Sequence, residues 1–173
     1  MNNDRSQNAP LVTGIGKALE GKYLTFALAN EEYGIGILTV REIIGLMPIR
    51  TVPQTPGFVK GVINLRGKVI PVVDLRLKFG MEEIEHTERT SIIVVDVGAG
   101  TEGSERPTHI GIVVDYVSEV INIKAEEIEA PPAFGSELNT EYILGMAKVG
   151  QTVKILLDIN RILGSEELSG LGF

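Results

Sequence analysis

The sequence predicts an all-β fold of two small five-stranded barrels packed against each other around a shared apolar core. Short apolar and β-branched segments recur at regular spacing with turn residues between them, a pattern typical of sandwiches and barrels. The order of these segments occurs twice along the chain, which indicates an internal duplication. Many segments lack a clean alternation of apolar and polar residues, so we expect both of their faces to be covered.

The duplication is clearest between residues 61–80, "GVINLRGKVIPVVDLRLKFG", and residues 145–164, "GMAKVGQTVKILLDINRILG". Their glycine ends, apolar positions and single aspartates coincide. Upstream, Gly34 aligns with Gly111, Val40 with Val117 and Glu42 with Glu119. The positive charge is not repeated, because Arg66 aligns with Gly150 and Lys68 aligns with Thr152.

In the first half, two apolar segments around the turn "NEE" are expected strands, at 23–29 and 33–38. The next residues, "TVREIIGLM", combine a helical turn with a strand, and the three prolines after them cannot continue a ladder. Residues 58–65 and 68–75 form a strand pair around the tight turn "RG". A short helical exit then ends at Gly80.

The second half begins after the acidic linker "MEEIEHTER" and follows the same order. A β-branched strand, "TSIIVVDV", leads into a long hairpin loop at 98–107. We therefore expect a flexible tail at 1–20, one folded domain at 21–168 and a C-terminal tail at 169–173. Within the domain, the first barrel is predicted at about 21–80 and the second at about 90–160.

Composition excludes several classes of protein. The chain has 173 residues, no Cys and two His, which leaves no disulfide, no thiolate metal site and no Cys nucleophile. A net charge of −7 argues against general affinity for nucleic acid. No apolar run reaches the roughly 20 residues of a membrane helix, and the N-terminus lacks the apolar core of a signal peptide. These features predict a cytoplasmic protein without direct membrane insertion.

No motif for catalysis or a cofactor is complete. The segment "GKALEGKY" lacks the hydroxyl residue and the helix that a phosphate loop needs. Asp74 and Asp158 occupy matched positions before helical turns, where a carboxylate caps free N–H groups. A carboxylate-dependent hydrolase and a proline-motif peptide module remain as alternatives, but His is scarce and the nine aromatic residues are scattered.

The segment "FVKGVINLRGKVIPVVDLRLKFG" strongly resembles the signature of chemotaxis coupling proteins, the CheW family. "EEYGIGILTVREI" and "GIVVDYVSEV" are similar to two further segments of that family, so the resemblance covers about residues 20–168. It implies two barrels of Src-homology-3 (SH3) type and no enzymatic activity. It also implies a cytoplasmic adaptor that joins the signalling tips of chemoreceptors to the regulatory domain of the histidine kinase CheA, within membrane-associated receptor arrays. The alternative is a peptide-binding regulatory barrel of another two-component pathway.

The resemblance also implies partner-binding positions, which the duplication divides into two groups. Val40, Glu42 and Gly61 recur in the second half, so each also has a structural explanation. Asn64, Arg66 and Lys68 do not recur, so folding does not require them. Arg66, in the turn of a basic stretch at 60–80, is the strongest binding candidate because a guanidinium can hold a partner's carboxylate by two hydrogen bonds.

Overall fold

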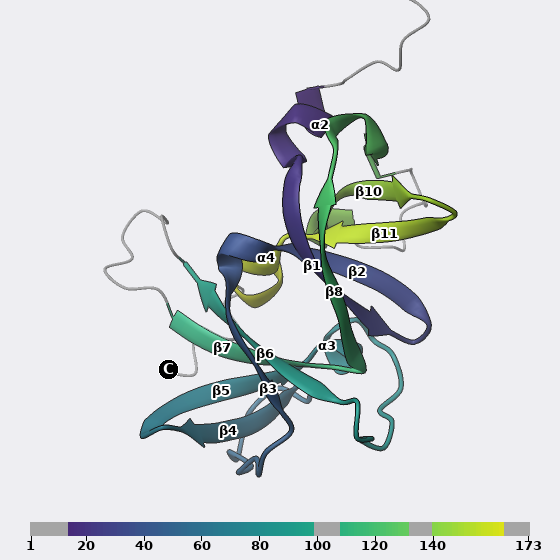
Figure 1. The fold of residues 1–173 in the computed structure, drawn as a ribbon. Coiled ribbons are helices and arrows are strands. Elements are labelled where there is room, and N and C mark those ends of the chain that lie inside the picture. The colour runs from purple at the N-terminus through teal and green to yellow at the C-terminus, as the bar shows by residue number, and fades with distance from the viewer. Residues whose placement is uncertain (1–13, 99–107, 132–139, 165–173) are drawn as a thin grey trace, which may run out of the picture.

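The computed structural model describes residues 14–98, 108–131 and 140–164. Most of them lie in short strands (Figure 1). We define the first repeat as residues 21–80 and the second as residues 91–163. The first repeat contains β1 (Gly21–Leu28), β2 (Glu31–Gly36), the 3₁₀ turn η1 (Ile37–Thr39), β3 (Val40–Gly45), β4 (Val59–Leu65), β5 (Lys68–Asp74) and α3 (Leu75–Lys78). The second contains β6 (Ser91–Val97), β7 (Thr108–Val114), β8 (Tyr116–Ile123), η2 (Ala125–Glu127), β9 (Ile128–Glu129), η3 (Thr140–Tyr142), β10 (Ile143–Val149), β11 (Thr152–Leu157) and α4 (Ile159–Leu163).

The strands form two sheets, each of which closes into a small barrel. Barrel 1 has the strand order β3-β6-β7-β5-β4, and barrel 2 has the order β8-β1-β2-β11-β10-β9. The chain that follows β3 returns to β4 through a bridge between Arg50 and Val62, and β9 pairs with β10 at the matching place in barrel 2. The predicted all-β architecture of two barrels is confirmed, and Figure 1 shows β3 and β8 running between them.

The barrels do not divide along the chain as predicted. Strands β1 and β2 of the first repeat lie in barrel 2, while β6 and β7 of the second repeat lie in barrel 1. Each repeat therefore places one hairpin in the middle of the other repeat's sheet. The assignment of residues 21–80 to one barrel and 90–160 to the other is wrong, because the chain changes sheet at η1 and again between β7 and β8.

The internal duplication extends to strand register. In barrel 1 the parallel pair β5–β7 sets Val72 beside Gly111, and in barrel 2 the parallel pair β11–β2 sets Leu156 beside Gly34. Each glycine faces a bulky neighbour across its ladder at the aligned position. Register shifts also occur at matching places, one in β4 just before Gly61 and one in β10 just before Gly145. The two barrels are therefore copies of one strand arrangement.

A shared core joins the barrels, as the sequence predicts. The largest buried cluster takes side chains from strands of both barrels, including Ile35 from barrel 2 and Ile112 from barrel 1. Four aromatic rings form a row through and beside it, with centroids 5.9, 6.1 and 6.3 Å apart. The rings belong to Phe26, Tyr33, Phe79 and Tyr142, in that order. Smaller apolar clusters fill the interior of each barrel.

One helix lies where the sequence predicts a loose tail. Helix α2 (Gly14–Leu19) packs near η2 and β9 of barrel 2, and Gly16 is buried there. A Cβ on Gly16 would lie 2.3 Å from the carbonyl oxygen of Ala125, so the close approach requires glycine. The predicted hairpin loop falls outside the described residues apart from Gly98, and so does the predicted C-terminal tail.

Both predicted aspartate caps are present. Asp74 Oδ1 accepts a hydrogen bond from Leu77 N (3.3 Å) at the start of α3. Asp158 Oδ1 accepts bonds from Asn160 N (3.1 Å) and Arg161 N (3.3 Å) at the start of α4. Asp74 is buried, and this burial raises the pKa of its carboxyl group even though backbone hydrogen bonds oppose the shift.

An ionic contact between Arg76 and Asp115 ties the repeats together. Arg76 Nε and Nη2 each donate to a carboxylate oxygen of Asp115, both at 2.8 Å, and both side chains are largely shielded from solvent. Ala29 N, in the turn between β1 and β2, donates to the same carboxylate at 2.9 Å. Burial alone would raise the pKa of Asp115, but the bonds from Arg76 and Ala29 outweigh it and hold the pKa below its usual range.

The exchange of hairpins predicts that the chain unfolds as one unit. Each sheet needs strands from both repeats, so loss of one barrel removes strands from the other. Differential scanning calorimetry should therefore give a single peak whose van't Hoff and calorimetric enthalpies agree. Two separated peaks would contradict the shared core.

The Asp115 contact predicts a pH-dependent loss of stability in Asp115→Asn. At pH 7 the variant should lose about 2 kcal/mol, because an amide cannot replace a carboxylate that accepts two charge-assisted bonds. The pKa of Asp115 is lowered on folding, so its contribution is present above the unfolded-state pKa of about 4 and disappears as the pH falls through the lower folded-state value.

Urea unfolding of the parent protein and of Asp115→Asn at pH 7 and near pH 3 gives their free energies of unfolding. The difference between the two free energies should become smaller in acid. Glu129→Gln is the matched control, because it alters an exposed ion pair with Lys148 and should change little at either pH. If the difference in free energy of unfolding does not change with pH, the charge of Asp115 is not what stabilises the contact.

Candidate interaction surface

The β4–β5 turn holds Arg66 in a backbone conformation that favours glycine. Arg66 and Gly67 have φ angles of 50° and 84°, as a tight turn between antiparallel strands requires. Such a left-handed φ costs a non-glycine residue about 1 kcal/mol. The aligned residue of the second repeat is Gly150, with φ 61°. Asn64 Oδ1 accepts a bond from Gly67 N (2.9 Å), so the predicted binding residue Asn64 helps to shape this turn.

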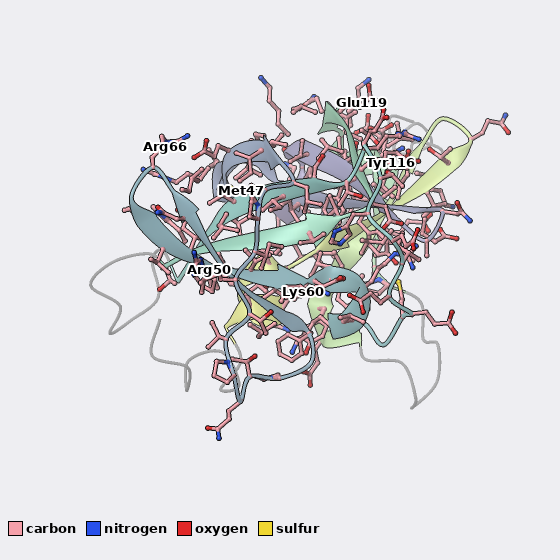
Figure 2. All side chains as sticks on the ribbon, turned by 90° about the horizontal axis from the view of Figure 1, so that it is seen from below. Met47, Arg50, Lys60, Arg66, Tyr116 and Glu119 are labelled. Atoms are coloured by element: carbon pink, nitrogen blue, oxygen red, sulfur yellow. The ribbon has the colours of Figure 1, made fainter. Side chains whose placement is uncertain are left out.

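Arg66 and Glu42, two of the predicted binding residues, form an ion pair. Nη2 of Arg66 contacts Oε1 of Glu42 on β3, with 70% of the arginine side chain exposed and 30% of the glutamate. β3 and β4 are the two edges of barrel 1, so the pair reaches across the place where the barrel closes. Figure 2 shows Arg66 at the end of the β4–β5 hairpin, on the opposite side of the view from Glu119 and Tyr116. We call Glu42, Arg66 and Lys68 the hairpin face.

Barrel 2 has no equivalent of this pair. Glu119 aligns with Glu42, but Gly150 offers it no side chain. The Glu119 backbone instead exchanges hydrogen bonds with the hydroxyl of Thr25, at 2.8 and 3.2 Å. Two barrels with the same fold therefore present different chemistry at aligned positions.

Most of the basic stretch at 60–80 is neutralised within the chain. Lys60 pairs with Glu83, and Arg76 pairs with Asp115. The ammonium of Lys78 lies 4.3 Å from the ring centroid of Phe58. Among the residues that the structure describes, Lys68 has no ion pair, and its side chain is exposed. Within the described residues, the positive charge of this stretch is therefore exposed mainly around Arg66 and Lys68.

Two other predicted binding residues have structural roles. Val40 is half-buried and packs against the shared core, as does the aligned Val117. Gly61 is buried with φ 140°, and a Cβ there would lie 1.9 Å from the carbonyl oxygen of Arg50. Both residues shape the barrel under the hairpin face, and the expectation that Val40 lies at a contact surface finds no support in its burial.

The structure adds exposed apolar side chains that sequence reasoning missed. Ile43 on β3 and Val69 on β5 are 45% and 67% exposed, and the aligned Val120 and Val153 are 51% and 46% exposed. Leu38 in η1 is 95% exposed. The sequence does carry a signal for the strand residues, since both repeats place an apolar residue directly beside one that faces the core. Successive strand residues point to opposite faces, so one member of each such pair faces outward.

The alternative peptide-binding module is not supported. Recognition of proline motifs uses exposed aromatic side chains, and every aromatic residue in the described ranges is buried or half-buried. None of the helices in the described part of the chain is long and apolar enough to span a membrane.

Two duplicated barrels around one core present an exposed, charged hairpin face. Residues 22–167 match the family model described as CheW-like domain. Similar curated proteins include the chemotaxis protein CheW of Klebsiella aerogenes, 42% identical over 89% of this chain and 88% of that protein, and that of Treponema pallidum, 32% identical over 86% and 85%. The crystal structure of the scaffolding protein TtCheW from Thermoanaerobacter tengcongensis has a TM-score of 0.73 and 34% identity, covering 86% of this chain and 96% of that one. The chain belongs to the CheW family of chemotaxis adaptors.

The environment of Gly61 predicts a large effect of one added methyl group. Gly61→Ala should lose about 3 kcal/mol, because the Cβ would displace Arg50, which exchanges two 2.8 Å backbone hydrogen bonds with Val62. Gly57→Ala is the control, since a Cβ added to Gly57 would have no atom within 4 Å of it. Denaturant unfolding compares the two variants, and equal stabilities would show that the bridge is not needed.

Proposed function

We propose that this adaptor couples the cytoplasmic signalling tips of chemoreceptors to the histidine kinase CheA within membrane-associated receptor arrays. Membership of the CheW family supports this proposal, since the chain matches its relatives over nearly their whole length. A coupler must hold two different partners at once. Two barrels fused through one core provide two fixed surfaces on a single rigid body.

The observation that carries the proposal is the difference between aligned positions. Glu42 and Arg66 form an exposed pair on barrel 1, whereas the aligned residues of barrel 2, Glu119 and Gly150, form none. The backbone at this position does not require arginine, because its conformation suits glycine better. A side chain held at such a cost, exposed at the end of a hairpin, points to a contact outside the chain.

We assign the hairpin face to the regulatory domain of CheA. On this proposal Arg66 donates to a carboxylate or carbonyl of the kinase, while Glu42 holds the guanidinium in position from β3. Lys68, which has no ion pair with another described residue, adds a positive charge beside it and contributes mainly to the rate of association. Glu42 acts through Arg66 and is thus a positioning residue.

Arg66→Gly tests this assignment with little risk to the fold. The variant should keep its stability or gain up to about 1 kcal/mol, because glycine accepts the turn conformation. Binding to the isolated CheA regulatory domain should weaken at least tenfold, about 1.4 kcal/mol, while binding to a receptor signalling tip stays unchanged. Isothermal titration calorimetry with each partner measures both.

Exchanging the charges of Glu42 and Arg66 tests whether Arg66 contacts the kinase directly or only keeps the hairpin in shape. Glu42→Arg combined with Arg66→Glu retains an ion pair between β3 and the hairpin but moves the guanidinium, so kinase binding should be as weak as in Arg66→Gly. Binding as tight as that of the parent protein would show that the pair only shapes the hairpin. The matched control exchanges the exposed pair of barrel 2, Lys148→Glu with Glu129→Lys, and should leave kinase binding intact.

A further inference from the structure

Strand pairing between the two repeats is extensive and contributes to both sheets. Four ladders join them, namely β1–β8, β2–β11, β3–β6 and β5–β7. Within a single repeat, the described strands pair only as β1–β2 and β4–β5, or as β6–β7, β10–β11 and the short β9–β10. The Arg76–Asp115 contact and the shared core also cross between the repeats.

The linker that connects the two repeats, residues 81–90, has little structure of its own. Residues 81–90 contain no helix or strand, and all side chains from Glu82 to Arg89 are exposed. The middle of the linker is held by an ion pair between Lys60 and Glu83 and by a bond from Arg76 to the carbonyl oxygen of Glu82 (3.1 Å). Exposed contacts of this kind stabilise weakly. At the start of the linker Met81 packs against the shared core, and at its end the Arg89 guanidinium lies 3.7 Å from the ring centroid of Tyr116. Ten residues in extended form reach about 33–36 Å, so an extended linker could connect repeats that lie in different pairs of barrels.

We propose that two copies of this chain exchange repeats by opening the linker at residues 81–90. In the resulting dimer, each pair of barrels consists of the first repeat of one copy and the second repeat of the other. All four ladders and the Arg76–Asp115 contact form again, now between chains. Only the linker changes conformation, so protein concentration and linker length decide between the closed monomer and the exchanged dimer. This inference does not depend on the proposed function.

The absence of Cys makes a direct test possible. Lys22 on β1 and Asn122 on β8 are exposed and lie opposite each other across the β1–β8 ladder, where the separation of the chains suits a disulfide. In a Lys22→Cys, Asn122→Cys variant, a monomer closes this disulfide within one chain. An exchanged dimer closes it between chains and runs as a covalent dimer on a non-reducing gel.

The matched control places both cysteines in one repeat. Lys148 and Val153 are exposed and paired within the β10–β11 hairpin, so Lys148→Cys with Val153→Cys closes within one chain in the monomer and in the exchanged dimer alike. Both variants are unfolded in urea and refolded with oxidant at rising protein concentration. We expect the covalent dimer to increase with concentration in the Lys22–Asn122 variant only. Its absence at every concentration, or equal amounts in the control, overturns the proposal.

A shortened linker gives a second measurement. Deletion of residues 83–87 leaves too little chain for the linker to keep its present path, so the protein should become dimeric at concentrations where the parent is monomeric, with an unchanged circular dichroism spectrum. Size-exclusion chromatography with light scattering reports the mass. A folded monomer would overturn the proposal. If the deletion prevents folding, the refolding experiment with the native linker decides alone.

Discussion

The exchange of hairpins between the repeats is the constraint on which the rest of the structure depends. β6 and β7 lie between β3 and β5 in barrel 1, so the two sides of the hairpin face are joined through strands of the other repeat. Glu42 on β3 and Arg66 after β4 both belong to the first repeat, yet their meeting requires the second. The face that we assign to the kinase is therefore a product of the whole fold.

The sequence was sufficient to predict the positions of the strands, the duplication, the tight turn at Gly67 and the two aspartate caps. It was not sufficient to predict which hairpin joins which sheet. Strands that are covered on both faces carry no alternation that would identify a neighbour. The duplication adds a second difficulty, because β1–β2 and β6–β7 have similar patterns and each is compatible with either sheet.

For the candidate site, comparison of aligned positions predicts that folding does not need the Arg66 side chain, and the left-handed φ that Arg66 shares with Gly150 agrees with this prediction. The pairing with Glu42 could not be predicted, since it forms only when the barrel closes. Asn64 and Gly61 have backbone roles that depend on a turn hydrogen bond and on the approach of Arg50. Local sequence contains neither. Side-chain exposure at Leu38 likewise follows from the path of η1 between the barrels.

The central place of β6 and β7 has a consequence for synthesis on the ribosome. A nascent chain that has reached Gly80 contains β1 to β5, but β3 still lacks its partner β6, and β2 lacks β11, which ends at Leu157. Barrel 1 cannot close until β7, which ends at Val114, has been made, and barrel 2 cannot close until almost the entire polypeptide has been translated. Such distant pairing slows folding, and the early strands have unpaired edges that favour aggregation in the meantime. The first half of this adaptor therefore contains no complete barrel when its synthesis ends.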